Sequence, residues 1–274
     1  MKKFIALLMA ALLMFSFAGC TDTKVDEESS TNEALEDASV ATASDLEYIK
    51  SKGTIVVGIT DYAPMDYKEE GSDEWTGFDA EFARAFAKEL GVEIEFIEID
   101  WDNKVFELSA KKIDCIWNGM TITDEIKLNT NVSNAYVKNA QVVVMAADKA
   151  ADYTDAASMA DLSFAVEVGS AGEAAAKENN FDFVSVDTQS KALMEVQAGT
   201  SDACIIDITM ANAMTGEGTS YATLKSCLEL TSEEYGVAFR KGSDVTAALN
   251  QFMVDQKTAV LEPLAQKYEL TLAF

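Results

Sequence analysis

The residues best suited to bind a small molecule are a carboxylate and two aromatic side chains that follow strand-like segments. Asp207 ends the apolar run ACIID, Tyr62 follows the run TIVVGI, and Trp101 lies in a polar turn between two aspartates. A partly desolvated carboxylate pairs strongly with an ammonium group, and an aromatic face attracts a cation by roughly 0.5–2 kcal/mol. These residue types suit a ligand with a positively charged nitrogen, and two facing rings can hold either a cationic or an apolar side chain. The alternatives are that the rings belong to the core and that Asp207 caps the following helix.

Two short polar loops lead into predicted helices, whose starts could bind the negative end of a ligand. Asn118, Gly119 and Thr121 follow the strand-like IDCIW, and Ser170 and Ala171 lie in a Gly-Ser-Ala-Gly turn between a predicted strand and a predicted helix. Backbone N–H groups at a helix start have no partner within the helix and favour a carboxylate. Simple helix capping and an ordinary strand-to-helix turn are the alternatives for these loops.

Composition excludes several classes of function. The chain contains no histidine, which removes Ser-His-Asp catalysis, Cys-His pairs and histidine-ligated metal sites. Its formal charge of -26 opposes binding to nucleic-acid phosphates. No pair of acids is placed for acid–base catalysis. We therefore expect no catalytic residue, no metal and no cofactor.

The N-terminus has the pattern of an export signal. Two lysines precede an apolar run at 4–17, and small residues stand before Cys20. Small residues before a cysteine resemble the lipobox of bacterial lipoproteins, so we expect lipidation at Cys20, with a plain secretory signal as the alternative. Residues 21–44 are acidic and lack aromatic residues, which predicts a disordered tether. No later segment approaches the ~20 apolar residues of a membrane helix.

Three further cysteines remain if Cys20 is modified. Cys115, Cys204 and Cys227 lie in apolar, strand-like contexts, and an odd number cannot all pair within the chain. Buried free thiols are the prediction, while a bridge from Cys204 to Cys227 stays open.

The order of the predicted elements indicates an α/β protein with two lobes. A β-branched strand at 54–59 is followed by an amphipathic helix at 77–91, which Asp79 can cap at its start. Four apolar side chains lie on one face of that helix: Phe78, Phe82, Phe86 and Leu90. Strands and helices then alternate, and the pattern restarts after Asp148. Alternation of this kind predicts parallel sheets covered by helices.

Several motifs in this order resemble the polar amino-acid branch of the bacterial extracellular solute-binding proteins, family 3. They are VVGITDYAP, GFDAEFARAFAKELG, KKIDCIWNGMTITDE, the DACIID strand and EEYGVAFRKGSD. The resemblance implies a two-lobed, type II periplasmic-binding-protein-like fold with two hinge crossings. We expect lobe 1 at 45–143 and 236–274, lobe 2 at 144–235, and crossings at AQVVVM and EYGVAFR. It also implies an extracytoplasmic, lipid-anchored monomer that delivers a small polar amino acid to an ABC permease in the membrane.

The same resemblance assigns roles to the candidate residues. Tyr62 and Trp101 match aromatic positions of the ligand cleft, and Asp207 matches the acid that pairs with the ligand's α-ammonium. The NGMT segment matches the residues that bind the ligand's main-chain atoms. One departure is that Ile126 stands where the family usually has an arginine that holds the α-carboxylate.

Two other functions stay open on this fold. One is a sensor that binds an amine or amino acid and signals to a separate receptor. The other is an enzyme similar to cyclohexadienyl dehydratase, which would need acid–base pairs without histidine.

Overall fold

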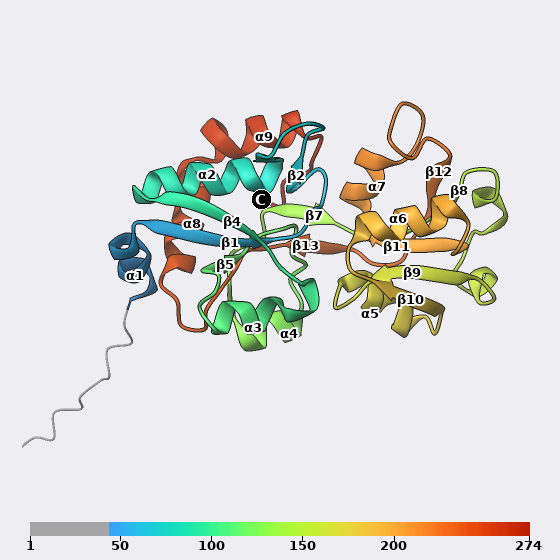
Figure 1. Cartoon of the computed structure of the whole chain (residues 1–274), viewed down its shortest axis with the longest axis horizontal. Helices are drawn as coiled ribbons and strands as arrows, with labels where there is room; N and C mark the ends of the chain where they lie inside the picture. Colours follow the sequence, from blue (N-terminus) through green and yellow to red (C-terminus); the bar gives the residue numbers. More distant parts are fainter. Residues whose placement is uncertain (1–43) are drawn as a thin grey trace, which may run out of the picture. The chain divides into compact units, whose positions relative to one another are not determined.

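The computed structural model describes residues 44–274, and these residues contain two separate five-stranded sheets (Figure 1). The predicted export signal, Cys20 and nearly all of the predicted tether lie outside the described residues. The first sheet has the strand order β4 (Glu93–Glu98), β1 (Thr54–Ile59), β5 (Cys115–Ile116), β14 (Ala238–Phe239) and β6 (Asn131–Val132). β1 runs parallel to β4 and β5, whereas β14 is antiparallel to its neighbours. The predicted α/β class is confirmed, whereas the predicted parallel sheets are mixed, because both also contain antiparallel pairs.

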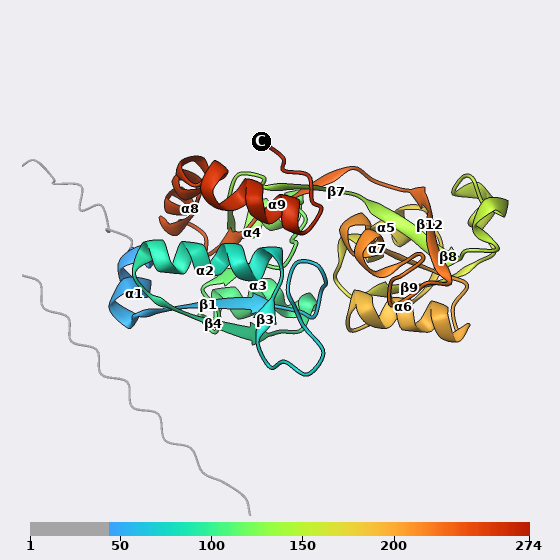
Figure 2. The same cartoon turned by 90° about the horizontal axis from the view of Figure 1, so that it is seen from above.

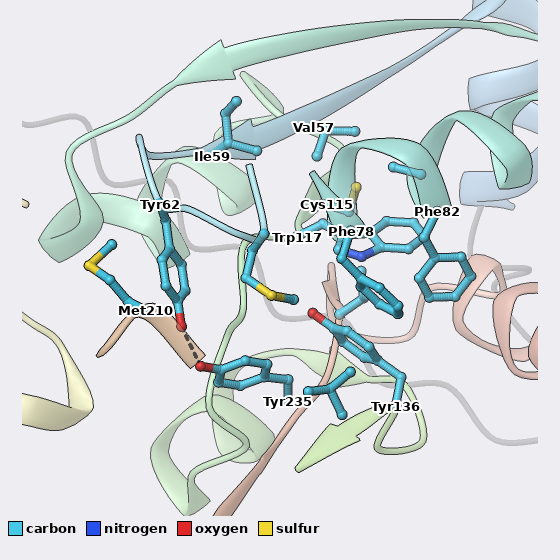
Figure 3. Packing of buried hydrophobic residues seen from close by; sticks show 14 of the residues in the cluster. Val57, Ile59, Tyr62, Phe78, Phe82, Cys115, Trp117, Tyr136, Met210 and Tyr235 are labelled. Atoms are coloured by element: carbon cyan, nitrogen blue, oxygen red, sulfur yellow. Dashed lines mark hydrogen bonds between the residues drawn. The ribbon is translucent and has the colours of Figure 1, made fainter. Parts of the chain in front are cut away.

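Helices cover both faces of the first sheet. On one face lie α2 (Phe78–Leu90), α8 (Val245–Asp255) and α9 (Glu262–Lys267), and on the other lie α3 (Lys104–Ser109) and α4 (Asp124–Asn129) (Figures 1 and 2). The predicted apolar stripe of α2 is buried in the core that these helices share with the sheet. Phe78, Phe82 and Phe86 of this stripe pack with aromatic residues of neighbouring elements: Trp117, Tyr136 and Phe252. Figure 3 shows Phe78, Phe82, Trp117 and Tyr136 in this core.

The predicted cap of α2 is wrong. Gly77 is the N-cap residue and makes no side-chain capping bond. Asp79 is fully buried, and its Oδ2 accepts hydrogen bonds from Gly119 N at 2.6 Å and Tyr136 Oη at 2.7 Å. The carboxylate therefore points into the lobe, where it fixes the loop that contains Gly119.

The second sheet is built in the same way. Its strand order is β10 (Asp182–Val186), β9 (Ser163–Glu167), β11 (Ala203–Asp207), β8 (Gln141–Ala146) and β12 (Leu224–Glu229). α5 (Ala171–Glu178) packs on one face, and α6 (Gln189–Ala198) and α7 (Ile208–Met214) pack on the other (Figure 1). Alternate residues of β8 enter different cores, since Val142 and Val144 pack with α6 while Val143 and Met145 pack with α5. A central strand buried on both faces explains the continuous apolar run in the sequence.

Two short strands connect the lobes. β7 (Val137–Asn139) pairs antiparallel with β13 (Glu233–Tyr235), with Val137 opposite Tyr235. The expected crossing at AQVVVM is displaced, because those residues form β8 inside the second sheet, and the connecting strand β7 directly precedes them. The second expected crossing, EYGVAFR, begins in β13 and ends in β14 of the first sheet.

The remaining elements lie at the margins of the two sheets. They are α1 (Asp45–Lys52), β2 (Tyr67–Lys68), β3 (Trp75–Thr76), η1 (Trp101–Asn103), η2 (Ala150–Asp152), η3 (Ala157–Met159) and the π-helical η4 (Lys257–Leu261). No helix within 44–274 is both long enough and apolar enough to cross a membrane. Cys115, Cys204 and Cys227 are free thiols, of which Cys227 is half-buried.

A buried carboxylate, Asp114, links three parts of the first lobe through hydrogen bonds: the end of α1, strand β1 and the residue after β14. Asp114 is 1% exposed and accepts from Lys52 Nζ at 2.5 Å, Val56 N at 2.9 Å and Arg240 Nη2 at 3.1 Å. Arg240 also donates to Asp45. Removal of one member of a buried charge network leaves its partners uncompensated.

We therefore expect Asp114→Ala to lower the free energy of unfolding by about 3 kcal/mol, measured by urea denaturation. The matched control is Asp148→Ala at an exposed position, which should change it by less than about 0.5 kcal/mol. Equal effects of the two substitutions would show that the buried network does not stabilise the lobe.

Candidate functional site

A cavity of about 470 Å³ lies between the two lobes and is lined by residues of both. Loops at the carboxyl ends of strands β1, β5, β9 and β11 contribute to its wall. All the predicted ligand-binding residues line it: Tyr62, Trp101, Asn118, Gly119, Thr121, Ser170, Ala171 and Asp207. The structure thus brings the whole predicted set together, although their binding of a ligand stays a prediction.

Asp207 is a buried carboxylate held by amide side chains. It is 4% exposed at the end of β11 and accepts from the side-chain nitrogens of Asn139, Gln141 and Gln189. Burial, together with the nearby charge of Glu233, raises the pKa of Asp207 to about 7. The side chain makes no capping bond to α7, so the capping alternative for Asp207 is wrong. The three amides fix the direction of a carboxylate that faces the cavity.

Tyr62 forms a rigid part of the wall. Its hydroxyl is hydrogen bonded to Thr209 Oγ1 and to Tyr235 Oη, both at 2.5 Å, and Figure 3 shows the two tyrosines pointing at each other. Gly119 has a φ of 55°, and a Cβ there would lie 2.5 Å from the Tyr62 ring. Glycine is therefore required at position 119 for the ring to approach the loop.

Trp101 lies against a lysine that the sequence analysis did not select. Lys104 Nζ lies 4.8 Å from the centroid of the Trp101 ring and donates to Trp101 O at 3.1 Å and Gly169 O at 2.9 Å. Burial lowers the pKa of the Lys104 ammonium, which the charges of Glu167 and other acids partly oppose. The only sequence signal was a lysine at the start of a helix, three residues after the cleft tryptophan.

The donors of the NGMT loop are engaged within the protein. Asn118 Nδ2 donates to Thr60 O at 3.0 Å and to Asp66 Oδ2 at 2.8 Å. Thr121 Oγ1 donates to Glu233 Oε1 at 2.9 Å, and the Gly119 N–H donates to Asp79. These groups would have to exchange partners in order to donate to a ligand.

The loop before α5 combines capping with a site for an anion. Ser170 is the N-cap, and its Oγ accepts from Glu173 N at 3.1 Å. Ala171 is the first residue of the helix and lines the cavity. The N–H groups of Ala171 and Gly172 in this first turn have no partner inside the helix, so they can serve an anion at the cavity wall.

Glu167 is a second buried acid of the cavity and was missed from the sequence. It ends β9 and is 3% exposed, and its Oε1 has no hydrogen-bond partner among the described residues. Burial and the charge of Asp207 raise the pKa of Glu167 to about 8. An acid at the end of the apolar run FAVE is the same signal that identified Asp207 in ACIID.

The cavity as a whole is acidic. Its charged lining residues are Asp102, Lys104, Glu125, Glu167, Glu173, Lys177 and Asp207. Ile126, which occupies the position of the expected arginine, is buried and lines the same cavity. A ligand with an excess of positive charge is therefore favoured.

The two lobes contact each other beside the cavity. Lys104 of the first lobe donates to Gly169 O of the second. A Cβ at Gly169, where φ is 69°, would lie 2.7 Å from Asp102 Oδ1. The lobes are thus in contact at this edge.

Comparisons with known proteins agree with this architecture. A family model of the bacterial extracellular solute-binding proteins, family 3, matches residues 55–271. The arginine-binding extracellular protein ArtP of Bacillus subtilis is 29% identical over 281 residues, covering 98% of each chain. Solved structures are similar as well. An ancestral amino-acid-binding protein, a precursor of cyclohexadienyl dehydratase, has a TM-score of 0.75 and 31% identity, covering 82% of this chain and 99% of the other. An amino-acid ABC transporter substrate-binding protein from Streptococcus pneumoniae, bound to L-arginine, has a TM-score of 0.73 and 28% identity, covering 84% and 100%.

The raised carboxyl pKa of Glu167 makes stability depend on pH. Its folded-state pKa exceeds the ordinary value of about 4.3, so its contribution to stability is full below that value and is lost as the pH rises through about 8. We expect the ligand-free protein to be less stable at pH 8.5 than at pH 5. Glu167→Gln should reduce this difference in unfolding free energy by at least about 1 kcal/mol.

Denaturant titrations at the two pH values test this expectation. Glu178→Gln on the exposed side of α5 is the control and should leave the pH dependence unchanged. If the unfolding free energy of Glu167→Gln depends on pH as that of the parent protein does, Glu167 is ionised without cost in the folded state.

Proposed function

Because the chain belongs to the bacterial extracellular solute-binding proteins, family 3, we propose that it is the substrate-binding component of an ABC-type amino-acid importer. It captures a polar amino acid in the cavity between its lobes and delivers it to a membrane permease. The observation that carries the proposal is Asp207, a buried carboxylate that faces the interlobe cavity. A volume of about 470 Å³ suits a single small ligand.

The ligand that fits best is an amino acid with a cationic side chain, such as arginine. Asp207 pairs with one positively charged nitrogen, and the unpartnered oxygen of Glu167 is available to a second. A ligand with two cationic groups would also favour the ionised forms of both acids. The relative ArtP and the similar Streptococcus pneumoniae structure, both named for arginine, support this choice.

Closure of the lobes completes the site. Asp207 and Glu167 belong to the second lobe, whereas Tyr62 and Trp101 belong to the first, so neither lobe can surround the ligand alone. A ligand that contacts both lobes binds the closed arrangement more tightly than the open one, and this difference in affinity stabilises the closed arrangement. The closed protein, acting as a monomer, is the form that docks on the permease.

The family is extracytoplasmic, and we propose a lipid anchor at Cys20 for this chain. The support is the basic, apolar and small-residue pattern that ends at Cys20. An anchor would keep the protein near its permease.

Two alternatives have less support. A sensor would use the same cavity, but would require a separate signalling partner. An enzyme related to cyclohexadienyl dehydratase has a link through the ancestral structure, which is itself an amino-acid-binding protein. The relatives reported above carry the names of binding proteins, and this favours capture over turnover.

Asp207→Ala tests the proposed function. We expect L-arginine to bind the parent protein and the variant to lose about 2–5 kcal/mol of binding free energy, because a buried partner of the ammonium is removed. Isothermal titration calorimetry measures the loss, and a thermal melt confirms that the variant is folded. Asp202→Ala, an exposed acid before the same strand, is the control and should bind like the parent protein. Unchanged affinity in Asp207→Ala would remove this residue from the site.

Cys20→Ser tests the anchor. We expect the parent protein in the membrane fraction of the expressing cells and the variant in the soluble extracytoplasmic fraction, because serine cannot form the thioether to lipid. Immunoblots of the fractions measure the distribution. Retention of the variant in the membrane fraction would contradict lipidation at Cys20.

A further inference from the structure

Two lysines line the acidic cavity, and they have different environments. Within residues 44–274, Lys104 and Lys177 are the only basic residues of the lining. Lys177 Nζ forms an ion pair with Glu173 Oε2 at 2.8 Å, and the Lys177 side chain is 60% exposed. Lys104 is more buried and has no carboxylate oxygen of a described residue within 4.0 Å. Its positive charge is therefore not neutralised by a direct ion pair.

The hydrogen bonds of Lys104 leave one donor for a ligand. An ammonium group has three N–H donors. Lys104 Nζ uses one on Trp101 O at 3.1 Å and one on Gly169 O at 2.9 Å. These two carbonyls fix the nitrogen at the junction of the lobes, and the third donor can bind an anion.

The surroundings of Lys104 also suit an anion. Gly169 directly precedes Ser170, the N-cap of α5, so Nζ lies beside the start of that helix. The N–H groups of Ala171 and Gly172 in the first turn of α5 carry partial positive charge and have no partner within the helix. One carboxylate can therefore reach both the ammonium and the helix start.

A zwitterionic ligand needs a cation in this cavity. Asp207 and Glu167 are both buried acids, and the ionised forms that a cationic ligand favours would repel the α-carboxylate of an amino acid. Ile126 is apolar and cannot compensate them, and the Thr121 hydroxyl already donates to Glu233. Lys104 is the group that can provide the opposite charge.

We propose that Lys104, together with the first turn of α5, holds the ligand's α-carboxylate and thereby selects amino acids over simple amines. This inference rests on the proposed function and deepens it, since it assigns the second charged end of the ligand. Asp207 and Lys104 then define the two ends of the site, with the acid on the second lobe and the base on the first. Loss of Lys104 converts the cavity into one that favours amines.

The test combines a change in the protein with a change in the ligand. Lys104→Met keeps most of the apolar stem and removes the charge, and agmatine is arginine without its carboxylate. We expect Lys104→Met to weaken binding of L-arginine at least 30-fold, while the affinity for agmatine changes by less than about 3-fold. Isothermal titration calorimetry with both ligands provides the four affinities.

The control is Lys177→Met, the same substitution at the other lysine of the cavity. It should leave the preference for arginine over agmatine within about 3-fold of the parent protein. Thermal melts of both variants establish that they are folded.

The outcomes separate the two proposals. Suppose that the parent protein binds L-arginine. If Lys104→Met leaves the affinity for L-arginine unchanged, or lowers the affinities for L-arginine and agmatine equally, Lys104 does not hold the carboxylate. The proposed function then still stands. If the parent protein binds neither L-arginine nor any other amino acid, both proposals are overturned.

Discussion

The burial of the Asp207 carboxylate is the constraint on which the site depends. An isolated buried carboxylate is very costly, and amide donors reduce that cost without neutralising the charge. Here the donors come from Asn139 on β7, Gln141 on β8 and Gln189 on α6. The amides thus fix the direction of the carboxylate, while burial and the charge of Glu233 raise its pKa, so that a cation would stabilise its ionised form. This is the state in which a ligand ammonium gains most from binding.

The same amides connect the acid to the hinge. Asn139 and Gln141 also donate to Glu233 Oε1, each at 2.7 Å, and Glu233 lies on the other connecting strand, β13. Thr121 of the first lobe donates to the same oxygen. A chain of hydrogen bonds therefore connects Asp207, through both connecting strands, to the first lobe. A rearrangement of the lobes that broke these hydrogen bonds would change the environment of Asp207.

Local patterns in the sequence predict much of this arrangement, because alternating strands and helices determine which segment ends meet at the cavity. The amphipathic face of α2 and the acid at the end of ACIID were identified in this way. Tertiary contacts decide the remainder. Asp79 looked like a helix cap, but it is drawn inward by Gly119 and Tyr136. Lys104 was missed because its carbonyl partner Gly169 is 65 residues away in the other lobe. Glu167 could have been predicted from the sequence, because it is an acid at the end of an apolar strand, as Asp207 is.

The most direct measurement is a crystal structure of the protein grown with L-arginine. Binding of a cationic amino acid between the lobes predicts one ligand in the cavity, with its α-ammonium nitrogen about 2.7–3.0 Å from a carboxylate oxygen of Asp207. Tyr62 and Trp101 should line the same ligand. A structure in which arginine lies outside the cavity, or in which Asp207 contacts only its three amides while the ligand is bound, would contradict this mechanism.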